Sequence, residues 1–206
     1  MQAAVRSHSG RAQVGSVVIY GVVAIFTFLC VVPFWYVLVS SFSQNGGFWI
    51  DEFTLDGYRY IFSTQTLPRS LINTTYITVL GTLLKLLVTS LMAYALAETS
   101  LPGRKLILNM VIFTMLFGGG MIPTYFVVRS TGLMNSLWSL VIPGLVSPFN
   151  LIVMKNFFQG IPQELRESAR IDGCHEMTLL FRIILPLSTA SLATFGLFYA
   201  VGLWNT

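Results

Sequence analysis

The feature that most constrains this chain is an uncharged apolar run from Val14 to Phe42. A helix that crosses the hydrocarbon core of a bilayer needs about 20 predominantly apolar residues, so this run is long enough to span with some tilt. A cleaved signal peptide is the alternative, but its apolar region is shorter and ends at a small-residue cleavage site, which is absent here. The sequence therefore predicts an uncleaved first membrane helix at 14–42.

Composition extends this interpretation to the whole chain. Hydrophobic residues make up 54% of the 206 residues and charged residues only 10%, whereas soluble domains carry about 25% charged residues. We predict an all-α, polytopic membrane protein. Its expected parts are a tail at 1–13, the first span at 14–42, an outer loop at 43–69, further spans at about 70–97, 106–128, 137–156 and 187–206, and a polar loop at 157–186.

The third of these runs has an unusual centre. Gly118-Gly119-Gly120 and Pro123 interrupt the apolar stretch at 106–128. Broken helices are tolerated in membranes where the freed backbone faces protein or water. The run is either a span with a hinge, or a helix that ends near Phe117 and is followed by an external segment.

The basic residues indicate which side of the membrane each loop occupies. If the N-terminus is inside and the spans alternate, eight of the 12 Lys and Arg residues lie inside, three lie outside, and Lys85 lies within a span. Loops on the cytoplasmic side carry an excess of Lys and Arg. We therefore expect a cytoplasmic N-terminus and a cytoplasmic loop at 157–186.

This loop has signals for two short helices. Pro162 suits the first helical position, Gln163 to Asp172 are mostly good helix formers, and Gly173 suits a left-handed helix end. A second helix is expected from His175 to Leu185, stopping at Pro186.

One face of the first loop helix is expected to be exposed and narrow. Helical periodicity places Leu165, Ser168, Ala169 and Asp172 together, with small residues in the middle that would let another surface approach closely. A solvated amphipathic connector with no partner is the alternative.

The same loop carries a spaced pattern of residues. Glu167, the small pair Ser168-Ala169, Gly173, Ile183 and Leu185-Pro186 follow one another with three residues before the glycine and nine after it. The segment resembles the cytoplasmic loop signature of ABC importer permeases. Ala190 departs from the pattern, because many members carry a second proline there. The resemblance implies the transmembrane domain of a type I ABC importer, a multi-pass protein of the bacterial plasma membrane.

Flanking segments narrow the resemblance. Leu101-Pro102-Gly103-Arg104, Gly119-Gly120-Met121-Ile122-Pro123 and Leu185-Pro186-Leu187-Ser188 look most like the carbohydrate-uptake branch, in its maltose-type second permease. Within that branch the chain is most similar to the Gram-positive polysaccharide and oligosaccharide permeases. Such permeases usually have six spans, so five predicted spans lead us to expect that the C-terminal part is missing.

The resemblance implies a transport subunit rather than an enzyme. The chain has no phosphate-binding Gly-x-x-x-x-Gly-Lys-Ser/Thr loop, so ATP is expected to bind a separate ATPase dimer. The other implied partners are a second permease, an extracellular or periplasmic solute-binding protein, a saccharide and the bilayer. Neither nucleic acid, metal nor cofactor is expected. Coupling to the ATPase is implied for Glu167, Ser168, Ala169, Asp172 and Gly173, and the signature ends at Ile183, Leu185 and Pro186.

Substrate contacts are less well indicated. An intramembrane lysine is a candidate functional residue, so Lys85 is a candidate for the substrate pathway. Asn150 is a second candidate. Snorkelling or pairing with a partner permease is the alternative for Lys85, and Asn150 equally suits a role between helices. Two other functions stay open: a permease for amino acids or other small solutes, and a membrane scaffold that transports nothing.

Overall fold

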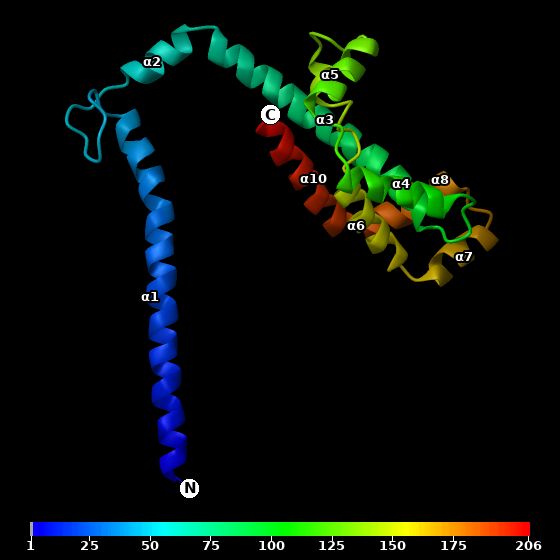
Figure 1. The fold of residues 1–206 in the computed structure, drawn as a ribbon, viewed down its shortest axis with the longest axis horizontal. Helices are drawn as coiled ribbons and strands as arrows, with labels where there is room; N and C mark the ends of the chain where they lie inside the picture. The colour runs from blue at the N-terminus through cyan, green and yellow to red at the C-terminus, as the bar shows by residue number, and fades with distance from the viewer. Residues whose placement is uncertain (1) are drawn as a thin grey trace. The chain divides into compact units, whose positions relative to one another are not determined.

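The computed structural model describes the backbone of residues 2–206 and the side chains from residue 15 onward (Figure 1). Across this part of the chain the regular structure is helical, and β pairing is limited to one isolated bridge between Ser43 and Phe53. The predicted all-α class is confirmed. The tail predicted at 1–13 falls on residues whose side chains lie outside the described part. The chain divides into two compact units, residues 1–68 and 69–206, which we describe separately.

The first unit contains the helices α1 (Gln2–Ser41) and α2 (Asp56–Ser63). α1 includes Pro33 and has 27 residues, Gly15–Ser41, that are apolar enough to cross a membrane. Between the helices, the Thr54 amide donates to the Phe42 carbonyl at 3.0 Å, and the Phe42 and Phe53 rings stack with centroids 5.7 Å apart. The outer loop predicted at 43–69 therefore contains a closed turn and the short helix α2.

Helix α3 (Thr66–Ala97) begins within the predicted outer loop, four residues before the predicted start of the second span at Ser70. It has 32 residues, and by length and apolar composition it is the second helix of the described chain able to cross a membrane. The other predicted spans are built from shorter pieces, so their number stays a prediction.

The third apolar run is not one helix. α4 (Arg104–Leu116) ends before the three glycines, and α5 (Met121–Ser130) begins after Gly120. Gly120, the N-cap of α5, has φ +80°, a positive value that favours glycine and is incompatible with a continuous α-helix. Of the two alternatives for this run, the structure has the helix that ends near Phe117.

The fourth run also differs from a continuous span at 137–156. It consists of a 3₁₀ turn, η1 (Leu137–Leu140), irregular backbone, and α6 (Pro148–Gln159). Pro143 lacks a backbone donor, which disfavours a helix through that position, whereas Pro148 lies in the first turn of α6, where no donor is needed. The Ser147 hydroxyl caps α6 by accepting from the Asn150 amide at 3.5 Å.

The chain ends in α10 (Thr189–Trp204), which follows α8 (Glu176–Leu179), the π-helical turn η2 (Leu180–Ile184) and α9 (Leu185–Leu187). α10 is bent by 85° relative to the helical segment before it. The core of the second unit lies where α3, α6, η2 and α10 pack together (Figure 1). Its most buried side chains are Ala93, Leu96, Leu151, Met154, Phe158, Leu179, Leu180, Ile184 and Phe195.

Candidate functional site

The loop signature forms a short helix, α7 (Gln163–Ile171), at the end of the second unit where α3 finishes (Figure 1). Pro162 precedes the helix as its N-cap instead of occupying its first position. Gly173 has φ +75°, as predicted. The Cys174 amide donates to the Ala169 carbonyl at 2.9 Å and the Gly173 amide to the Arg170 carbonyl at 3.0 Å. This pair of bonds is a Schellman motif, so glycine ends the helix and turns the chain back.

The buried side of α7 differs from the prediction. Arg166 and Ala169 are only 6% and 7% exposed, whereas Leu165, Ser168 and Asp172 are on the surface. Ala169 packs into the chain's own core, so its small side chain allows α7 to approach that core closely. The 3.6-residue period correctly placed Leu165, Ser168 and Asp172 on one helix face. It could not show that Ala169, at the border of that face, points toward the core.

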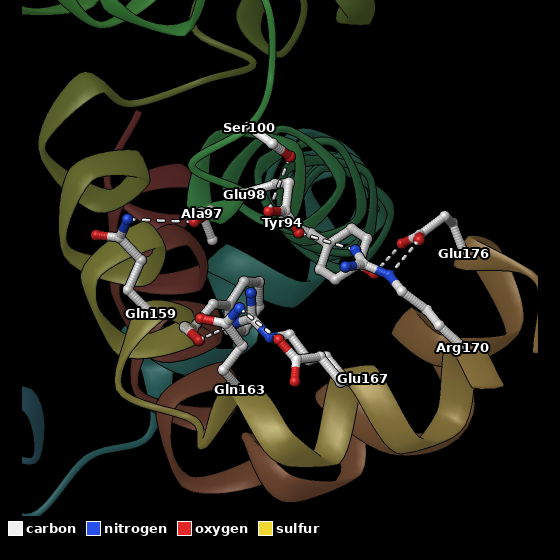
Figure 2. Close-up of polar contacts among 11 residues, drawn as sticks. Tyr94, Ala97, Glu98, Ser100, Gln159, Gln163, Glu167, Arg170 and Glu176 are labelled. Atoms are coloured by element: carbon white, nitrogen blue, oxygen red, sulfur yellow. Dashed lines mark hydrogen bonds and ion pairs between the residues drawn. The ribbon is translucent and has the colours of Figure 1, made fainter.

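Arg170 holds α7 against α3 and α8 (Figure 2). Its Nε donates to Glu176 Oε1 at 2.8 Å, and its Nη2 donates to Glu98 Oε2 at 2.8 Å. The Tyr94 hydroxyl donates to the second oxygen of Glu176. The guanidinium lowers the pKa of both carboxyl groups, and these carboxylates raise the pKa of Arg170. Three elements are thus joined through one side chain.

A second set of bonds connects α7 to α6 and α6 to α3. The buried Arg166 donates from Nη2 to the carbonyl of Phe158, near the end of α6. Gln159 donates from Nε2 to the Ala97 carbonyl at 3.2 Å, the last residue of α3 (Figure 2). Because the bonds run through main-chain carbonyls at helix ends, they also satisfy acceptors that the helices leave free. α7 is fixed to the core at two separate points.

The outer surface of α7 combines carboxylates with apolar side chains. Gln163 donates from Nε2 to Glu167 Oε1 at 2.7 Å, and the Glu167 carboxylate remains exposed (Figure 2). Ile171 is 86% exposed, and Leu165 and Met177 are also exposed. Exposed apolar residues bordered by charges are typical of surfaces that bind another protein.

The end of the signature does not stop a helix. Ile183 and Leu185 are half-buried, Pro186 is exposed, and the helical backbone continues through Pro186 to Leu187. Proline lacks a donor and its ring clashes with the carbonyl four residues earlier in an α-helix. The π turn at Leu180–Ile184 widens the backbone just before Pro186, which lets the chain pass the proline.

The two predicted substrate-pathway residues lie away from this loop. Lys85 is half-buried near the middle of α3, and its Nζ lies 5.8 Å from the centroid of the Tyr199 ring on α10. Asn150 is buried in the first turn of α6. The structure places Lys85 against α10 and Asn150 in α6, and it joins neither to the network around Arg170.

Several residues of the site were missed from the sequence. Tyr94, Glu98, Gln159 and Glu176 all take part in holding α7 in place. The separation of six residues between Arg170 and Glu176 across a glycine turn was a usable signal for that pair. Glu98 is 72 residues from Arg170, and only the folded chain brings them together.

Comparison with known proteins places this arrangement in a family, although no protein-family model matches the chain. It is 47% identical over 200 residues to the polygalacturonan/rhamnogalacturonan transport system permease protein YtcP of Bacillus subtilis, covering 91% of this chain and 68% of that protein. The chain is also 52% identical over 184 residues to Protein LplC of B. subtilis, and the match covers 86% of this chain and 62% of that protein. The chain thus spans about two-thirds of the length of these curated relatives.

A solved structure agrees. The chain superimposes with a TM-score of 0.89 and 28% identity on a chain of a bacterial ABC transporter involved in the import of the acidic polysaccharide alginate, covering 94% of this chain and 71% of that one. The resemblance predicted from the loop signature and its flanking motifs is confirmed. The chain belongs to the permease family of carbohydrate ABC importers, multi-pass subunits of the plasma membrane that are not themselves enzymes.

Proposed function

We propose that this chain forms part of the translocation pathway of an ATP-driven oligosaccharide importer and receives the force of ATP binding through α7. The observation that carries the proposal is the contrast between the two sides of α7. Its inner side is bonded to the core through Arg166 and Arg170, and its outer side presents the exposed carboxylate of Glu167 beside exposed Ile171. A helix attached firmly on one side and open on the other suits the transmission of a rigid-body movement.

The coupling follows from these attachments. A separate ATPase dimer would bind the outer side of α7, with Glu167 facing a basic residue of the ATPase, and Ser168 and Asp172 lie on the same exposed side. When the ATPase subunits close, α7 would carry α3 and α6 with it, because Arg170 and Gln159 tie these elements together. Such a rotation of rigid elements would alternate the pathway between inward-open and outward-open states.

The remaining parts of the importer are inferred from the family. A second permease would complete the pathway, and an extracellular or periplasmic binding protein would deliver the cargo. The relatives named for polygalacturonan/rhamnogalacturonan and for alginate support a saccharide cargo for this chain. The basic residues at 155, 166, 170 and 182 support a cytoplasmic position for α7 and, with alternating spans, a cytoplasmic N-terminus.

Charge reversal at Glu167 tests the coupling. The chain is co-expressed with its ATPase, second permease and binding protein, and uptake of a labelled oligosaccharide is measured in cells. We expect Glu167→Lys to reduce uptake at least about tenfold, since a buried charge pair at an interface is replaced by repulsion. Glu52→Lys makes the same change at an exposed residue of the first unit and should leave uptake near normal.

Membrane levels of both variants are measured by immunoblot, and retention of the ATPase is measured by co-purification. Reduced ATPase retention with Glu167→Lys at normal membrane levels supports docking at α7. Normal uptake by that variant would rule out Glu167 as part of the coupling contact.

A further inference from the structure

Arg166 places a buried charge on the inner side of α7. Its Nη2 donates to the Phe158 carbonyl, which is a neutral acceptor. Among the described residues, its Nε has no hydrogen-bond acceptor and no carboxylate forms an ion pair with its guanidinium. Charges buried in proteins are normally paired, because burial removes the water that would otherwise stabilise them. Arg166 therefore lacks a counter-ion in this part of the chain.

A cavity of about 110 Å³ lies beside this arginine. Thr99, Gln159 and Gln163 also line it and are exposed, so the cavity opens to the surface between α7 and the turn after α3. Gln159 comes from α6 and Gln163 from α7 (Figure 2). Sites for small-molecule ligands usually measure about 300–1,000 Å³. This cavity is too small for a sugar or a nucleotide and suits a single side-chain group.

The carboxylate that lines the cavity already has partners. Glu98 accepts from Arg170 Nη2 through Oε2 at 2.8 Å and from the Ser100 hydroxyl through Oε1 at 3.1 Å. Arg170 is in turn shared between Glu98 and Glu176. A water molecule in the cavity would satisfy a donor of Arg166 but would leave its charge without a counter-ion. The cavity therefore favours an anion from outside the chain.

The cavity adjoins the surface proposed to receive the ATPase. Arg166 and Glu167 are neighbours in α7, and Gln163 at the cavity edge donates to Glu167 Oε1 at 2.7 Å. A protein that covers Glu167 therefore also reaches the cavity. Complementary charges at such a contact are a cation opposite Glu167 and an anion opposite Arg166.

We propose that the cavity receives a carboxylate side chain of the ATPase, an Asp or a Glu that pairs with Arg166. This rests on the proposed function and specifies the contact that the ATPase makes. The carboxylate supplies the missing counter-charge, and a hydrogen bond between two charged groups is stronger than one between neutral groups. Together, Arg166 and Glu167 present two opposite charges side by side, which fixes the orientation in which the ATPase docks.

Cross-linking identifies the residue of the ATPase. The exposed Thr99 at the cavity edge is changed, as Thr99→p-benzoylphenylalanine, in the complete permease complex with its ATPase bound. After irradiation, the cross-linked peptide is sequenced by mass spectrometry. We expect a peptide of the ATPase with an Asp or Glu at or next to the cross-linked position. The same substitution at Ser130, at the end of α5, is the control and should capture no ATPase peptide.

Removing the charge measures the pair. The Kd of the ATPase dimer is determined for the permease complex in lipid nanodiscs. Arg166→Met keeps an apolar stem but removes the guanidinium, and we expect the Kd to rise at least about tenfold. Arg182→Met, at an exposed arginine, is the matched control and should leave the Kd near that of the wild type.

A change on the ATPase alone leaves this chain intact. Replacing the cross-linked acid by its amide should raise the Kd as much as Arg166→Met does, and combining the two changes should add little, because both remove the same pair. This variant decides the outcome if hydrogen exchange shows that Arg166→Met loosens α7.

An unchanged Kd with the amide variant, additive effects of the two changes, or a cross-linked peptide without an acidic residue would overturn the pair. A loss with Arg166→Met that occurs only when inorganic phosphate is present would assign the cavity to a free anion instead. If Glu167→Lys weakens ATPase binding and Arg166→Met does not, only this inference is refuted. If neither changes the Kd, docking at α7 is refuted as well.

Discussion

The α7 end of the second unit and the middle of α3 treat charge in opposite ways. Around α7, Arg170 is shared between Glu98 and Glu176, and the buried Arg166 reaches a main-chain carbonyl. At mid-α3, Lys85 meets an aromatic ring and no carboxylate of the described chain. Charges matched within the chain fix its internal geometry, whereas a charge without a carboxylate partner inside a membrane helix marks a candidate functional residue.

The two regions also differ in the solvent exposure of their polar groups. The groups paired around Arg170 are partly exposed, so each ion pair contributes little by itself and their value lies in joining three elements. Thr89 and Tyr199 are buried, so their hydroxyls depend on each other. Variants in the two regions should therefore fail in different ways.

The largest effect is expected from removing Arg170. Arg170→Met leaves Glu98 and Glu176 without their shared cation and should lower the free energy of unfolding of the second unit by about 1–2 kcal/mol. Hydrogen exchange should rise mainly in α7 and at the end of α3. Arg182→Met, at an exposed arginine for which the described residues show no ion pair, is the control. Equal exchange in both variants would show that α7 is held without this network.

A smaller effect is expected from pH. The folded pKa values of Glu98 and Glu176 are below the ordinary 4.5, because Arg170 stabilises their charged forms. Their contribution to stability is complete above pH 4.5 and is lost as the pH falls through the lowered pKa values. Protease accessibility of the loop at 157–186 should therefore rise on acidification below that point. Arg170→Met should remove this acid-dependent step, and its persistence in that variant would assign it to other groups.

The smallest effect is expected at the mid-helix site. Tyr199→Phe keeps the ring beside Lys85 but removes the 2.8 Å bond to Thr89, which should cost about 0.6–1 kcal/mol. Thermal unfolding in detergent measures this loss. Tyr125→Phe, at an exposed tyrosine of α5, should change stability much less. If both variants have the same thermal stability, the bond to Thr89 does not stabilise the fold. The proposed difference between the partly exposed region and the buried region would then be wrong.

Much of the α7 site was predictable because its signals are local. Gly173 adopts the left-handed conformation that its place after a run of helix formers predicts, and the spacing from Glu167 to Pro186 identified the family. The inward side of α7 was not predictable, since Ala169 is small enough for either a partner or the core. Glu98 was missed because loop residues far apart in sequence carry no shared pattern.

The sequence by itself determined that this protein is helical and membrane-bound, since long apolar runs such as 14–42 and 70–97 satisfy their backbone groups in a bilayer only as helices. Only the tertiary structure decided where the shorter runs break, which side of α7 is buried, and that Lys85 faces α10. These depend on contacts between distant segments, and side-chain packing selects among arrangements that local preferences leave nearly equal in free energy.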